Sequence, residues 1–197
     1  MKFKIGSVSV FVSFTFFAAA LFFTVVGRGE LLAVTYLCAL LHEAGHMAAI
    51  LLFGGRLQAI RLTLAGAEIR RREPSGLSRG REALVCLAGP AVNLALALGS
   101  LFACGDGRFS QVNFLLCGFN ALPFYSLDGG RVIEVLLAAR FSRRTVCIVG
   151  DVLSLAAIVL LGAVSVAVFV REGRASPFWI VTVYLLSAFL MKKRSCS

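Results

Sequence analysis

The chain has 197 residues, of which 59% are hydrophobic and only 15% are charged. Soluble globular domains carry about a quarter charged residues, so this composition argues against a soluble protein and favours an integral membrane protein. The formal net charge is +10. No motif of nucleic-acid-binding proteins accompanies the basic residues, so we expect no nucleic-acid partner. The length allows one domain over residues 1–197.

Six apolar segments predict an all-α membrane protein with six transmembrane helices, because lipid leaves backbone polar groups no partner outside the segment. The segments cover residues 5–26, 31–53, 83–103, 109–127, 145–170 and 177–191. The first follows Met1-Lys2-Phe3-Lys4 and resembles a signal peptide. Its uncharged run is longer than the hydrophobic region of a usual signal peptide, so a retained first span is favoured.

Basic residues in alternate loops predict the orientation of the spans. Sixteen of the 20 Lys and Arg fall on one side, at both termini and in the loops after the second and fourth segments. The other side holds four, which are Arg28, Arg108, Arg171 and Arg174. The positive-inside rule then places both termini of this multi-pass protein in the cytosol.

The loop after the second segment, residues 54–82, is the longest. Apolar and polar residues alternate over 60–64, residues 65–67 can turn the chain, and 68–70 can return. This pattern predicts a small β-hairpin at the cytosolic face. The alternative is an interfacial basic loop without strands.

The chain has two histidines, His42 and His46, in the sequence His42-Glu43-Ala44-Gly45-His46. A spacing of four places both imidazoles on one face of a helix, where they can hold one zinc ion. Glu43 stands beside the first ligand and can act as general base. The alternative is that the pair only packs in the helix bundle. Ionisable groups inside a membrane are costly and usually mark function, so we predict a metal site.

A catalytic zinc usually has three protein ligands, and there is no third histidine. Asp128 ends the fourth apolar segment, and we predict that it is the third zinc ligand. Asp151 is the alternative. Asn120 and Pro123 should break the helix before Asp128. Irregular backbone at membrane depth is tolerated where it lines a cavity.

Two smaller expectations concern the surroundings of this site. Gly129 and Gly130 should let the chain bend sharply after Asp128. Cys38 lies one turn before His42 and could approach the metal, although a small residue that permits close helix packing is the favoured interpretation.

Three segments in this order resemble the site-2 protease family of intramembrane zinc metalloproteases. They are His42-Glu43-Ala44-Gly45-His46, the run Ala88-Gly89-Pro90-Ala91-Val92-Asn93, and the run from Asn120 to Gly130 that reads NALPFYSLDGG. The resemblance implies a zinc-dependent endopeptidase that cleaves a transmembrane segment of another protein. It assigns His42, His46 and Asp128 as ligands of one zinc ion per chain and Glu43 as the catalytic base. It gives Asn120 a role at the oxyanion or at the substrate backbone.

Within the family, the compact six-span plan resembles the stage IV sporulation protease FB group of bacterial cell membranes, which cleaves a membrane-tethered pro-sigma factor. We expect no PDZ-like insertion and no carboxy-terminal CBS domain. Partners would be the protein substrate, membrane lipid and regulatory membrane proteins. A substrate helix would unwind at the site and pair with the strand over residues 60–64.

The two alternative functions are an inactive membrane scaffold or chaperone and a metal transporter. A catalytically inactive scaffold or chaperone would be indicated by loss of Glu43 or Asp128, and both are present. A metal transporter would usually show paired half-chains with broken helices in corresponding places. The sequence shows one broken span, which favours the protease.

Overall fold

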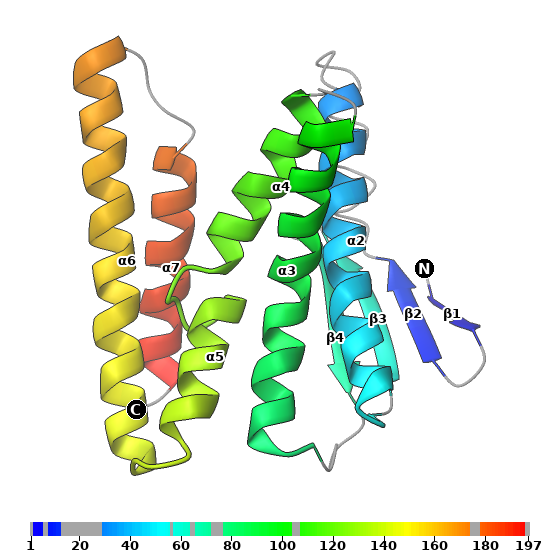
Figure 1. The fold of residues 1–197 in the computed structure, drawn as a ribbon. Coiled ribbons are helices and arrows are strands. Elements are labelled where there is room, and N and C mark those ends of the chain that lie inside the picture. Colours follow the sequence, from blue (N-terminus) through cyan, green and yellow to red (C-terminus); the bar gives the residue numbers. More distant parts are fainter. Residues whose placement is uncertain are drawn as a thin grey trace. The chain divides into compact units, whose positions relative to one another are not determined.

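The computed structural model describes residues 2–5, 8–12, 29–55, 57–63, 66–71, 77–103, 107–173 and 178–195 (Figure 1). The helices in these residues are α2 (Gly29–Leu52), α3 (Arg79–Ala103), α4 (Gly107–Asn120), α5 (Asp128–Leu137), α6 (Arg143–Glu172) and α7 (Phe178–Ser195). The strands are β1 (Lys2–Ile5), β2 (Val8–Val12), β3 (Leu57–Thr63) and β4 (Gly66–Arg71).

Packing divides the chain into two compact units, Met1–Ala121 and Leu122–Ser197. In the first unit, α2, α3 and α4 all contact one another, and β3 and β4 pack against α2. In the second unit, α6 contacts both α5 and α7. The single-domain organisation stays a prediction.

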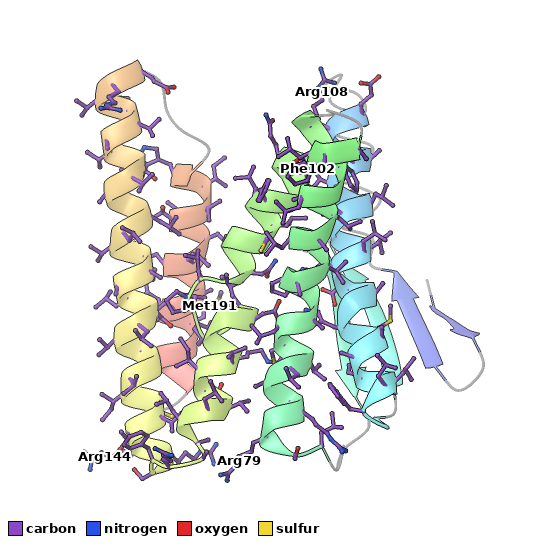
Figure 2. The ribbon with its side chains drawn as sticks, viewed as in Figure 1. Arg79, Phe102, Arg108, Arg144 and Met191 are labelled. Carbon is purple, nitrogen blue, oxygen red and sulfur yellow. The ribbon has the colours of Figure 1, made fainter. Side chains whose placement is uncertain are left out.

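Three helices, α2, α3 and α6, are long and apolar enough to cross a membrane. The outward surface of α6 is apolar, since Val152, Val159 and Leu160 expose 61%, 63% and 60% of their surface. In the first unit, Arg79 and Arg108 lie at opposite ends of the helices (Figure 2). Apolar outer faces with charges at the ends suit lipid, and the chain is an integral membrane protein.

The prediction of six spans is met in part. Predicted spans two, three and five correspond to α2, α3 and α6. Helix α4 has 14 residues, and the apolar part of α7, Trp179–Met191, is shorter than the roughly 20 residues that a span needs. The described residues therefore contain six helices, of which three have the length and composition of a span.

The strands form one sheet in the order β1-β2-β3-β4. β3 and β4 pair as an antiparallel hairpin, in which Thr63 opposes Gly66 and Ile60 opposes Ile69. This is where the alternating residues predicted a hairpin. The expectation that a substrate strand adds to residues 60–64 is wrong for this sheet, because β3 already pairs with β2 on one side and β4 on the other.

The predicted first helical span is also wrong at its beginning. Residues 8–12 form β2, which pairs parallel to β3 from Ser9 opposite Ala59 to Val12 opposite Leu62. β-branched residues at 8, 10 and 12 explain this, because they favour strands over helices. Residues 13–26 of that predicted span lie outside the described residues.

The predicted break of the fourth span is confirmed. α4 ends at Asn120, and α5 begins at Asp128 after an irregular segment that contains Pro123. The predicted bend at Gly129 and Gly130 is wrong, because both residues lie in the first turn of α5. Gly130 serves close packing instead, since a Cβ there would overlap the carbonyl group of Phe124.

Candidate metal centre

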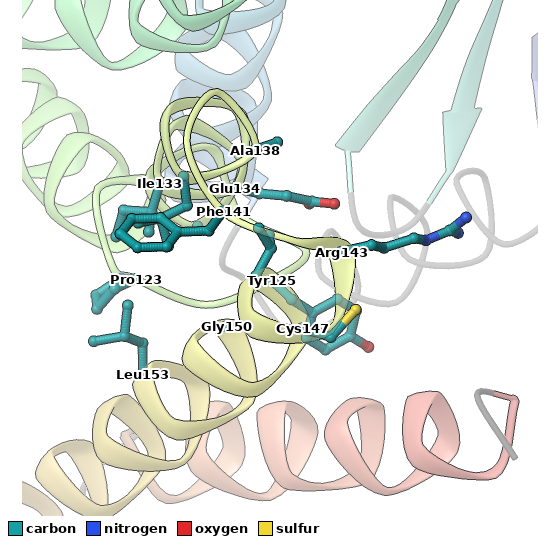
Figure 3. A pocket seen from close by; sticks show the side chains of 13 residues that line it. Pro123, Tyr125, Ile133, Glu134, Ala138, Phe141, Arg143, Cys147, Gly150 and Leu153 are labelled. Atoms are coloured by element: carbon teal, nitrogen blue, oxygen red, sulfur yellow. The ribbon is translucent and has the colours of Figure 1, made fainter.

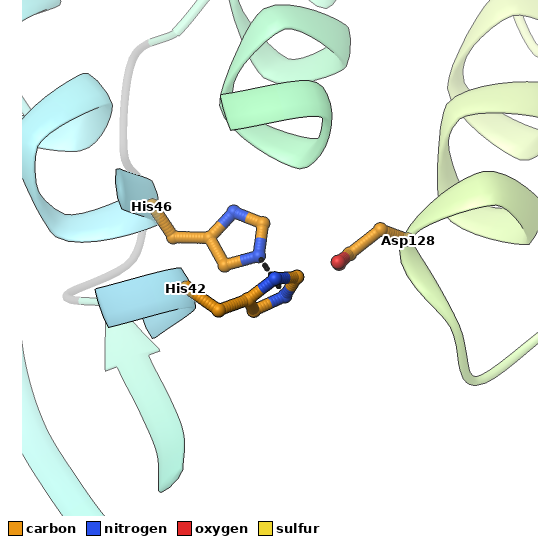
Figure 4. Close-up of side chains that lie close together, drawn as sticks. All are labelled: His42, His46 and Asp128. Atoms are coloured by element: carbon orange, nitrogen blue, oxygen red, sulfur yellow. Dashed lines mark hydrogen bonds between the residues drawn. The ribbon is translucent and has the colours of Figure 1, made fainter. Parts of the chain in front are cut away.

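The two histidines lie on one face of α2 and are almost fully buried, with 5% of His42 and 9% of His46 exposed. Their rings meet edge to face, with centroids 4.7 Å apart (Figure 4). The two Nε2 atoms are 3.1 Å apart and joined by a hydrogen bond. One turn of helix therefore brings together two nitrogen atoms that can both bind one metal ion, as the spacing in the sequence predicted.

The ring of His46 is held by the neighbouring helix. Its Nδ1 lies 2.7 Å from the carbonyl oxygen of Val85 on α3. A carbonyl oxygen only accepts hydrogen bonds, so Nδ1 carries the proton and donates it. The lone pair of His46 is then on Nε2, which faces His42. Backbone carbonyls orient metal-binding imidazoles in this way.

Helix α3 approaches the histidines at a glycine. A Cβ on Gly89 would collide with His46 Nε2 and lie 2.7 Å from both Cε1 and Nε2 of His42. A Cβ on Gly45 would lie 2.8 Å from Val92 Cγ2. Glycines at both positions let α2 and α3 pack closely, as small residues do in membrane helices. Gly89 also leaves open the space toward which both Nε2 atoms point.

These features fit a zinc ion. Two neutral imidazoles with converging Nε2 atoms are a common part of a zinc ligand set. Space is available because Gly89 carries no side chain there. Glu43, next to His42 in α2, is half-buried and adds a carboxylate in the same turn.

Cys38 packs one turn before His42 and is fully buried. Asn113 on α4 donates a hydrogen bond from Nδ2 to Cys38 Sγ over 3.1 Å and another to the carbonyl oxygen of Phe109 over 2.9 Å. The Cys38 sulfur thus lies at the contact of α2 with α4, in agreement with the favoured packing role.

The other predicted site residues lie at the ends or in the interior of helices α4, α5 and α6. Asp128 is the first residue of α5 in the second unit and is half-buried, and Asp151 lies within α6. A carboxylate in the first turn also suits the positive end of a helix. Asn120 is the last residue of α4, and its Nδ2 donates to the carbonyl oxygen of Leu116 over 3.0 Å. The ligand role of Asp128 and the catalytic role of Asn120 stay predictions.

No model of a known protein family matches the sequence, and no curated protein does. Among solved structures, the chain is similar to the site-2 protease from Methanocaldococcus jannaschii, with a TM-score of 0.65 and 18% sequence identity. The similarity covers 96% of this chain and 90% of that chain. The chain has the fold of that site-2 protease. At this identity the similarity concerns the fold alone.

Sequence reasoning missed two parts of the centre. It noted the segment from Gly89 to Asn93 only as a resemblance and gave Gly89 no role. It also could not find the Val85 carbonyl, because a backbone group has no signature in the sequence. A glycine followed by proline inside an apolar span was the available signal, since glycine there often marks close helix approach.

Proposed function

We propose that the chain is a zinc-dependent intramembrane endopeptidase that cleaves a membrane-embedded or membrane-tethered protein near the cytosolic face. The observation that carries this proposal is the pair of converging Nε2 atoms, 3.1 Å apart, on an apolar helix beside Glu43. Burying two imidazoles in a membrane helix costs free energy, and such polar groups usually mark a functional site. The site-2 protease fold supports the same chemistry.

In this proposal His42 and His46 of the first unit and Asp128 of the second hold one zinc ion. They supply two imidazole nitrogens and a carboxylate oxygen, which leaves a position for water or substrate as in other catalytic zinc sites. When bound, the zinc ion supplies a Lewis acid that polarises the peptide carbonyl and makes water acidic enough to react at neutral pH.

Glu43 is the general base in this proposal. One of its carboxylate oxygens takes a proton from the attacking water and passes it to the amide nitrogen as the peptide bond breaks. Asn120 would donate a hydrogen bond to the developing oxyanion or to the substrate backbone. The Nδ2 amide has two N–H bonds, one of which donates to the carbonyl oxygen of Leu116, and the other would serve this role.

The site lies about 9 Å from the end of α2, since Leu52 is six positions after His46 in the helix. With both termini in the cytosol, α2 runs inward and the site is near the cytosolic face. The substrate must unwind there, because a helix hides its carbonyl groups in hydrogen bonds. By resemblance, a pro-sigma factor in a sporulating bacterium is the candidate substrate, and regulatory membrane proteins are candidate partners.

Co-expression of the full chain with tagged single-span proteins tests the proposal. We expect Glu43→Gln to lower cleavage by about 10²- to 10⁴-fold while zinc per chain stays the same, because the base is lost and the ligands remain. Glu30→Gln is the matched control. Glu30 is on the same helix with its side chain 93% exposed, 3.7 Å from Arg108.

Full cleavage by Glu43→Gln would reject Glu43 as the base. A wild-type chain that binds zinc but cleaves no substrate would favour the alternative of an inactive membrane scaffold.

A further inference from the structure

A cavity of about 410 Å³ opens in the second unit between α5 and the first turns of α6 (Figure 3). Most of its walls are apolar, formed by Pro123, Ile133, Leu137, Phe141, Val146 and Leu153. Glu134 and Arg143 line it as well and are exposed. The volume is in the range of ligand-binding pockets, roughly 300 to 1,000 Å³.

Arg143 lines the charged end of this cavity, and two more arginines are close to it in the sequence. Arg140, Arg143 and Arg144 lie in and beside the short turn that joins α5 to α6, and all three are exposed. The first turn of α6 contains no acidic residue. Within the described part of the chain, none of the three arginines has an ion pair, although Glu134 lines the same cavity. Three positive charges therefore fall within five consecutive residues, one of them in the cavity wall, and would attract an anion.

The cavity extends from these charges into the apolar part of the unit. Arg143 is the first residue of α6, and Leu153 lies ten residues further on the same helix. Ten helical residues cover about 15 Å, or half the hydrocarbon thickness of a bilayer. A ligand that fills this space has a charged end at the membrane surface and a long apolar part within it.

We propose that this cavity binds an anionic phospholipid, with an acyl chain along the apolar walls and the phosphate at Arg140, Arg143 and Arg144. Arginine pairs with phosphate through two parallel hydrogen bonds. Basic pockets between membrane helices on the cytosolic side bind anionic head groups, and positive-inside orientation places this turn there. The proposal rests on the membrane location and is independent of the proposed proteolysis.

Glu134 narrows the choice of head group. Its carboxylate accepts hydrogen bonds and donates none, so a head group with hydroxyl groups suits this wall better than a second phosphate. Phosphatidylglycerol has one phosphate and two hydroxyls. We therefore expect it to bind in preference to phosphatidylcholine, whose head group has neither a net charge nor a hydroxyl.

Native mass spectrometry of the purified full chain, equilibrated with equal amounts of the two lipids with matched acyl chains, measures this preference. We expect the wild type to retain phosphatidylglycerol selectively, and each arginine replaced by Gln to lower the preference roughly 5-fold. Arg171→Gln, at the other end of α6, is the control and should change nothing. Equal retention of both lipids by the wild type would overturn the proposal.

A second variant tests the apolar walls. A Cβ on Gly150, which lines the cavity, meets no atom within 4 Å, so Gly150→Leu should fold and fill the space. We expect it to lose bound phosphatidylglycerol, whereas Gly99→Leu, also in open space on α3, keeps it. Unchanged retention by Gly150→Leu would place the lipid elsewhere. Displacement of the lipid by inorganic phosphate would indicate a plain anion site and also overturn the proposal.

Discussion

The two units differ in how well their buried polar side chains are hydrogen-bonded. In the first unit, His42, His46, Asn93 and Asn113 are all buried in the helices. Both amide atoms of Asn93 and the Oδ1 of Asn113 have no hydrogen-bond partner among the described residues. Polar groups buried without partners cost free energy, and that cost is greatest in lipid.

In the second unit the buried polar side chains are small and bonded. Ser154 Oγ accepts a hydrogen bond from the Tyr125 nitrogen, and Ser165 Oγ donates to the carbonyl oxygen of Leu161. Charged residues such as Arg143 and Arg144 stay exposed at the helix end. The difference indicates that the first unit gives up stability to bury polar groups in its interior, whereas the buried polar groups of the second unit are satisfied by hydrogen bonds.

The largest effect on zinc content should come from a side chain that fills the space beside the histidines. Gly89→Ala adds a Cβ where both Nε2 atoms point, so we expect zinc content to fall at least 10-fold. Zinc per purified chain measures this. Gly99→Ala on the same helix meets no atom and should keep full zinc. If Gly89→Ala bound zinc normally, the metal would not lie between the histidines and α3.

Asp128→Asn tests whether the second unit contributes to the centre. An amide is a weaker zinc ligand than a carboxylate, so we expect zinc affinity to fall on the order of 10-fold or more. Competition with a fluorescent zinc chelator measures the affinity. Asp151→Asn is the matched control in the same unit. A loss in Asp151→Asn, with Asp128→Asn unchanged, would make Asp151 the third ligand.

The smallest effect concerns stability in the second unit. Gly130→Ala forces a Cβ against the Phe124 carbonyl, and overpacking of this kind costs about 1–3 kcal/mol. Thermal unfolding in detergent should show a lower midpoint. Gly162→Ala is the control and should leave the unfolding midpoint unchanged, because its Cβ would lie at an ordinary contact distance of 3.8 Å from Thr182 Cγ2. A Gly130→Ala protein as stable as the wild type would mean that this turn can shift freely.

Much of the site was predictable because it depends on local rules. The spacing of His42 and His46 fixes their common face in any helix, and Pro123 must interrupt a helix wherever it stands. The alternation over residues 60–64 predicted the hairpin strand in the same way. Patterns of a few residues carry this information.

The parts that could not be predicted depend on contacts between distant segments. The parallel pairing of β2 with β3 joins residues about 50 positions apart. Because of this pairing, residues 8–12 form a strand where the sequence predicted the beginning of a helix. The collision at Gly89 depends on where α3 crosses α2, which composition does not determine. Gly130 was assigned a bend because glycine permits both unusual dihedrals and close contacts, and the sequence does not distinguish these uses.

The central claim is that His42 and His46, both buried in the first unit, hold a zinc ion. X-ray absorption spectroscopy at the zinc edge, on the purified zinc-loaded full chain, tests it directly. We predict two imidazole nitrogens and at least one oxygen as ligands, no sulfur, and one imidazole fewer in His46→Ala. A sulfur ligand, or an unchanged imidazole count in His46→Ala, would contradict the claim.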